Sequence, residues 1–165
     1  HKPDRRQRQM CIRDRSKGGE LHDSKSYNYA HVGVYFGILG LLTGMFWAKY
    51  TWGTYWTNDP KLNGSAIGLL IYFGYFILRS SIEDESKKGK ISSVYNVFAF
   101  SMLIPLIFIL PRLTDSLHPG NGGNPGFNVY DMNSQLRLVF YPAVTGFIFL
   151  GLWISDLRLK MLKLK

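Results

Sequence analysis

Residues 32–48, VGVYFGILGLLTGMFWA, form a run of seventeen residues without a charged side chain. At about 1.5 Å of rise per residue, a helix of this length spans roughly 26 Å, which is enough to cross the apolar core of a bilayer. Glycines recur along it at three- and four-residue spacing, which leaves one smooth helix face (Gly33, Gly37, Gly40, Gly44). The run therefore predicts a transmembrane helix that packs closely against a neighbour.

An uncharged, apolar run recurs three more times along the chain. The charged residues are concentrated in residues 1–25, 79–90 and 156–165. A soluble protein would instead mix polar and apolar positions at helical or strand spacing. Pro105 lies inside the third run, where a proline kink is tolerated because neighbouring groups bond the freed carbonyl. We predict an all-α integral membrane protein, a bundle of four transmembrane helices near residues 32–48, 62–78, 91–111 and 138–155.

The distribution of lysine and arginine predicts the topology. The connection after the second run carries four such residues (Arg79, Lys87, Lys88, Lys90), and so does the C-terminal tail (Arg158, Lys160, Lys163, Lys165). The loops at the other end carry two each (Lys49 and Lys61; Arg112 and Arg137). Positive charge stays on the cytoplasmic side. We therefore expect the C-terminus in the cytoplasm and residues 49–62 and 112–137 together on the outer face.

The flanking segments are polar. Residues 1–16, HKPDRRQRQMCIRDRS, show no helical apolar face. The letters MCIRDRS resemble translated sequencing-adapter sequence, so we expect either an artefactual head on a truncated fragment or a disordered basic tail. Residues 17–30 are expected to be a polar cytoplasmic lead-in with a flexible start at Gly18 and Gly19, and residues 157–165 a basic cytoplasmic tail. The single cysteine, Cys11, excludes an intrachain disulfide.

An aromatic stretch, WGTYWTNDPKL at residues 52–62, separates the first two runs. Its rings fit either an interfacial aromatic belt or a shelf for a flat, apolar ligand, with Gly53 allowing a close approach of the backbone. Asp59 precedes a proline, which is a helix start signal, so it serves as an N-cap, as a carboxylate that orients a ligand, or as both.

His118 is the one histidine in the loops assigned to the outer face. Neutral imidazole is a good ligand for haem iron, although a lone loop histidine is usually only solvated. His31 opens the first run at the cytoplasmic side and is expected to be interfacial. The sequence contains no phosphate-binding glycine loop and no pairing of nucleophile and base, so we do not expect an enzyme.

Two motifs resemble those of a known family. Residues 52–62 resemble the tryptophan-rich WWD signature of the haem-handling cytochrome c assembly proteins. Residues 114–120, TDSLHPG, resemble the outer-loop histidine motif of its haem exporter protein C (cytochrome c maturation protein C) branch, and TGMFWAK at residues 43–49 is also similar to that branch. The resemblance covers about residues 30–156.

The resemblance implies a bacterial inner-membrane protein that binds haem b as cargo at the periplasmic face. It would deliver haem to a periplasmic haem chaperone, together with a small membrane partner and an ABC-type ATPase and permease. One axial ligand of the haem iron would be His118. The resemblance and the chemistry of the stretch give the remaining haem-contacting residues (Trp52, Gly53, Tyr55, Trp56, Asp59, Lys61).

The chain also departs from this family. Tyr55 and Asn58 stand where the family often has tryptophan, and Lys61 where it often has arginine. The family usually has six spans and two axial histidines, so four spans and His118 alone would supply half of the ligation. Two alternatives remain open: a permease subunit of an ABC-type haem transporter, and a structural subunit of a respiratory complex. No nucleic-acid partner is expected.

Overall fold

The computed structural model describes residues 5–114, 116–118 and 133–163, and most of these residues lie in helices. In chain order the elements are α1 (Arg5–Trp52), α2 (Pro60–Ser81), α3 (Glu85–Leu103), the π-helical η1 (Ile104–Ile109), α4 (Leu110–Leu113) and α5 (Ser134–Lys163). In this described part, four helical stretches are long and apolar enough to cross a membrane: Leu21–Trp52, Pro60–Ser81, Lys87–Leu113 and Ser134–Leu162. The predicted all-α membrane bundle is confirmed.

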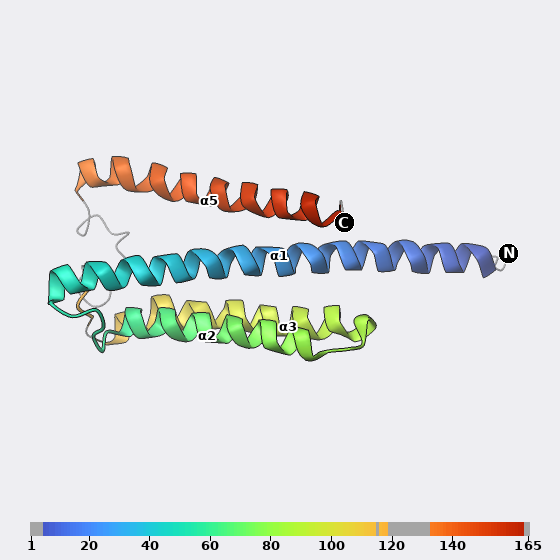
Figure 1. Ribbon diagram of the computed structural model, residues 1–165, viewed down its shortest axis with the longest axis horizontal. Coiled ribbons are helices and arrows are strands. Elements are labelled where there is room, and N and C mark those ends of the chain that lie inside the picture. The colour runs from blue at the N-terminus through green and yellow to red at the C-terminus, as the bar shows by residue number, and fades with distance from the viewer. Residues whose placement is uncertain (1–4, 115, 119–132, 164–165) are drawn as a thin grey trace.

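The long helix α1 is the centre of the arrangement (Figure 1). The hairpin of α2 and α3 lies along one side of it, and α5 lies along the other. The connection between α1 and α2 and the start of α5 lie at the same end of the bundle. This arrangement confirms that the loops after the first and third spans share one end.

Residues 17–30, the expected polar lead-in, belong to the continuous helix α1, and this helix includes Gly18 and Gly19, where a flexible start was expected. Tertiary contacts begin well before the first apolar run. Asn28 is buried, and its Nδ2 donates a hydrogen bond of 2.7 Å to the carbonyl oxygen of Ser155 in α5. These contacts stabilise the helical conformation in a segment whose composition does not favour it.

The third span contains Pro105, and the helix accommodates it by a change of winding rather than by a break. Residues 104–109 form a π-helical segment, which is followed directly by α4. A π-helical turn relieves the clash of the proline ring with the preceding turn and is a known cause of local bending. The expected distortion of the third span is thus present.

The glycines of α1 and α2 behave differently. A Cβ atom added at Gly64 would clash with the backbone oxygen of Leu106, and one at Gly68 would lie 2.9 Å from Leu103 Cδ2. The close packing predicted for the second run is confirmed there. In α1, however, three of the four glycines would meet nothing within 4 Å (Gly33, Gly40, Gly44). The prediction of a tightly packed glycine face on α1 is wrong for these three positions.

Candidate functional site

The end of α1 is shaped by Gly53. Its φ of 81° lies in the left-handed region, and its N–H donates a hydrogen bond of 3.1 Å to the carbonyl oxygen of Lys49. Glycine adopts this conformation without steric cost, which is why it commonly follows the last helical residue. Lys49 Nζ donates a second hydrogen bond of 2.8 Å to the Gly53 carbonyl oxygen. Gly53 therefore turns the chain away from α1 directly after Trp52, the last residue of the helix.

The start of α2 is fixed by Asp59. Its Oδ1 accepts hydrogen bonds from the N–H groups of Lys61 (2.9 Å) and Leu62 (3.3 Å), with Pro60 at the first helical position. The predicted N-cap is confirmed. The same carboxylate has a second set of partners: Oδ2 accepts hydrogen bonds of 2.7 Å from Ser116 Oγ and from the Leu117 N–H. Asp59 thus joins α2 to the segment that follows α4.

His118 lies against this carboxylate and against two indoles. Its Nδ1 is 2.8 Å from Asp59 Oδ1, in an off-axis approach that lacks the angle of a full hydrogen bond. Its ring centroid lies 5.0 Å from that of Trp52, nearly perpendicular, and 6.0 Å from that of Trp47. The two indoles contact each other edge to face at 5.1 Å. The histidine side chain is 27 % exposed.

The surroundings of His118 and Asp59 set the charge of both side chains. Burial lowers the pKa of His118 below its ordinary value; nearby Lys61 lowers it further, and the attraction of Asp59 only partly offsets these effects. Burial acts to raise the pKa of Asp59, but hydrogen bonds from Ser116 and Leu117 outweigh it, so that pKa lies below its usual value. At neutral pH the pair is therefore a carboxylate beside a neutral imidazole. Neutral imidazole keeps one nitrogen lone pair, the form that binds metals.

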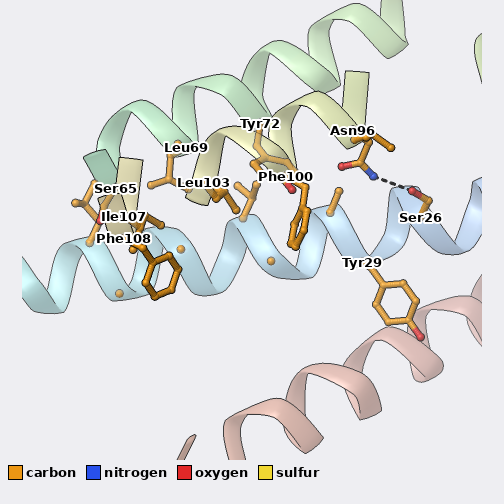
Figure 2. A pocket seen from close by; sticks show the side chains of 18 of the residues that line it. Ser26, Tyr29, Ser65, Leu69, Tyr72, Asn96, Phe100, Leu103, Ile107 and Phe108 are labelled. Carbon is orange, nitrogen blue, oxygen red and sulfur yellow. Dashed lines mark hydrogen bonds between the residues drawn. The ribbon is translucent and has the colours of Figure 1, made fainter. Parts of the chain in front are cut away.

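A cavity of about 1240 Å³ extends from this site along the inner face of the bundle. Figure 2 shows its walls: Leu69 and Tyr72 come from α2, and Phe100 comes from α3. Lys61 and His118 line it near the loop end of the bundle. Near the other end, Asn96 Nδ2 donates a hydrogen bond of 2.8 Å to Ser26 Oγ. The open glycines of α1 also border this space (Gly33, Gly40, Gly44).

The predicted site residues fall into two groups. Trp52, Asp59, Lys61 and His118 come together at the cavity end, as the contacts above show. Tyr55 makes a different contact: its ring is 6.0 Å from that of Phe46 and meets it edge to face.

The predicted residue Trp56 is 44 % exposed. Asn58, which departs from the family pattern, accepts a hydrogen bond of 2.7 Å at its Oδ1 from Asn63 Nδ2. The remainder of the loop after His118, from Pro119 to Met132, lies outside the described residues.

Two residues of the site were not predicted from the sequence. Trp47 was predicted only as part of the first span, yet its ring contacts both Trp52 and His118. The two tryptophans are five positions apart, which places them about 140° apart around a helix. This spacing is not that of one helix face, so the sequence pattern did not group them. Ser116 Oγ donates to Asp59 and accepts a hydrogen bond of 3.2 Å from the His118 N–H. A serine two residues before the histidine was the only available signal.

Comparison with known proteins identifies the family to which the chain belongs. A family model described as cytochrome C assembly protein matches residues 6–118. The chain is 27 % identical over 144 residues to heme exporter protein C of Bradyrhizobium diazoefficiens, a match that covers 87 % of this chain and 54 % of the relative. It is 26 % identical over 140 residues to that of Haemophilus influenzae (82 % and 54 %) and 27 % identical over 133 residues to that of Escherichia coli K12 (81 % and 52 %).

The chain thus spans about half the length of these curated relatives. The matched region contains the turn at Gly53, the cap at Asp59 and His118 at its last position. With a family match over more than half of its residues, the chain belongs to the cytochrome c assembly protein family.

Proposed function

We propose that this chain binds haem as cargo during cytochrome c maturation and holds it at the outer face of a bacterial inner membrane. The relatives are named heme exporter protein C, which supports haem as the ligand. The observation that carries the proposal is the neutral imidazole of His118, packed beside Trp52 and lining a cavity of about 1240 Å³. An imidazole nitrogen is a common ligand of haem iron, and a porphyrin needs apolar surface to pack against.

Each residue has a distinct part in this proposal. His118 supplies one axial ligand to the iron, and Trp52 supplies flat apolar surface beside it. Lys61 lines the same end of the cavity and meets a haem propionate as a point charge. Gly53 ends α1 directly after Trp52 and lets the chain turn toward Asp59. Tyr55 and Trp56 extend the aromatic surface at the loop end, where both rings are roughly half exposed.

The bound haem is passed to a periplasmic haem chaperone, with a small membrane partner and an ABC-type ATPase and permease as further members of the system. The position of the site supports this order of events. It lies at the end of the bundle, where residues 53–59 and 116–118 meet, rather than in the middle of a span. A ligand held there is accessible to a soluble acceptor protein. Transfer is tested by mixing haem-loaded protein with the purified chaperone and following the Soret band.

Haem binding is tested with His118→Ala and a matched histidine control, His31→Ala. His31 lies in α1 away from the loop end, where its Nδ1 is 3.0 Å from the Tyr27 carbonyl oxygen. Purified protein supplemented with haem is expected to show a Soret band that His31→Ala retains. His118→Ala is expected to weaken binding by at least about tenfold, because loss of even an outer partner of a metal ligand typically costs 10–100-fold.

Two results contradict the proposal. One is the absence of a Soret band in the wild-type protein after supplementation. The other is equal binding by His118→Ala and His31→Ala, which would place the haem elsewhere in the bundle.

A further inference from the structure

Asp59 is too deeply buried to form part of a surface that contacts a ligand. Its side chain has 0 % exposure. Oδ1 holds the two N–H groups of the first turn of α2 and lies 2.8 Å from His118 Nδ1. Oδ2 holds Ser116 Oγ and the Leu117 N–H, both at 2.7 Å. A carboxylate surrounded in this way acts through its neighbours.

These bonds exceed what a helix cap requires. Capping uses one side-chain oxygen, and serine or asparagine caps as well as aspartate does. The second oxygen of Asp59 reaches residues 57 and 58 positions further along the chain. Ser116 extends the connection, since its Oγ also accepts the N–H of His118. One carboxylate therefore fixes residues 116–118, either directly or through Ser116.

The contact with the imidazole has a chemical consequence. An ionised carboxylate accepts hydrogen bonds and cannot donate them, and its negative charge attracts a proton even off the axis of a full hydrogen bond. The nearer ring nitrogen is therefore favoured as the one that carries the proton. The nitrogen facing Asp59 is Nδ1. The other nitrogen, Nε2, then keeps its lone pair. In metal sites, a carboxylate that fixes a histidine in this manner sets both its tautomer and its ring orientation.

We propose that Asp59 is the positioning residue of His118: it holds the proton on Nδ1, keeps the ring against Trp52, and leaves Nε2 as the nitrogen presented to the haem iron. This inference rests on the proposed function for the identity of the metal. The tautomer and the orientation of the ring are properties of the protein without haem, and they can be measured separately.

The first test uses the full chain in detergent micelles without haem, labelled with ¹⁵N-histidine at mildly alkaline pH. His118→Ala identifies the signal of His118. The wild-type spectrum is expected to show His118 with its proton on Nδ1. A wild-type His118 that carries its proton on Nε2 overturns the proposal, whatever any variant does.

The variants separate capping from positioning. Asp59→Ser keeps a good cap but is too short to hold residues 116–118, so His118 is expected to shift toward the Nε2–H tautomer that free imidazole prefers. Ser116→Ala removes one bond to Oδ2 and the bond that Ser116 Oγ accepts from the His118 N–H. It leaves the contact of Nδ1 with Oδ1, so the tautomer is expected to stay as in the wild type. If Asp59→Ser does not fold, Asp59→Thr, which also caps and is equally short, takes its place. An unchanged tautomer in the folded Asp59 variant overturns the proposal.

The second test is a double-mutant cycle in haem binding. Asp59→Ser is expected to weaken haem affinity by about 10–100-fold in the wild-type background. In the His118→Ala background the same change is expected to alter affinity by less than about twofold, because the two residues act as one unit. Equal losses in both backgrounds mean that Asp59 acts on haem or on the fold independently, which contradicts positioning. If the wild-type chain binds no haem, the proposed function fails, and the tautomer alone decides the role of Asp59.

Discussion

Gly40 and Gly64 look alike in the sequence, since both stand among apolar residues at helical spacing, but they differ in the bundle. Gly64 faces the backbone of the π-helical segment, where a Cβ atom would clash with the carbonyl oxygen of Leu106. Gly40 faces the cavity and would meet nothing within 4 Å. A glycine in a transmembrane helix is therefore required for packing at one position and not at the other.

This difference gives a test with a built-in control. Gly64→Ala is expected to destabilise the bundle by about 1–3 kcal/mol, because backbone rather than a flexible side chain must move. Gly40→Ala is expected to be neutral or slightly stabilising, since alanine is the better helix former by about 0.5–1 kcal/mol. Unfolding titrations with SDS in mixed micelles measure both variants. A larger loss for Gly40→Ala than for Gly64→Ala would show that the glycine face of α1 is covered after all.

The helices α1 and α2 are joined by an ion pair near the end of the bundle opposite the histidine site. Arg79 donates to both carboxylate oxygens of Asp23, and the side chains are 13 % and 23 % exposed. The guanidinium also lies 4.6 Å from the ring centroid of Tyr27. A bidentate pair with a stacked aromatic ring fixes the register of one helix along the other more strongly than apolar contact does.

Breaking this pair from one side is expected to cost more than removing it. Asp23→Asn leaves the arginine largely buried without its charge partner, so a loss of about 1–3 kcal/mol is expected in the same SDS titration. The double variant Asp23→Asn with Arg79→Gln is expected to lose less than Asp23→Asn alone, because no buried charge is then left unpaired.

The exposed pair of Asp156 and Lys160 in α5 is the control for this ion pair. These side chains are 58 % and 68 % exposed, and Asp156→Asn is expected to change stability by no more than about 0.5 kcal/mol. Equal effects of Asp23→Asn and Asp156→Asn would mean that the α1–α2 pair does not set the helix register.

The whole molecule has two ends of different character. One end carries the aromatic turn, the cap and the histidine. The other carries the connection Ile82–Asp84 and the positively charged residues that flank it. Since lysine and arginine are retained on the cytoplasmic side, the histidine end is expected to face outward.

Cysteine labelling in intact bacterial cells measures this orientation. In a Cys11→Ser background, a charged maleimide that does not cross the membrane is expected to label Thr54→Cys directly. It is expected to label Glu83→Cys only after the cells are permeabilised. Both positions are exposed loop residues, so accessibility within the protein is matched. The reverse pattern would place the histidine site in the cytoplasm and contradict delivery to a periplasmic acceptor.

The sequence by itself determined the four spans, the shared end of the two functional loops and the cap at Asp59. These features depend on local composition: a bilayer requires continuous apolar runs, and aspartate before proline starts a helix. Only the tertiary structure decided that Gly64 is packed while Gly40 is open, that Trp47 contacts His118, and that Asp59 holds residues 116–118. Those outcomes depend on which helices meet and at what register, and contacts between residues more than fifty positions apart leave no periodic signal in one chain.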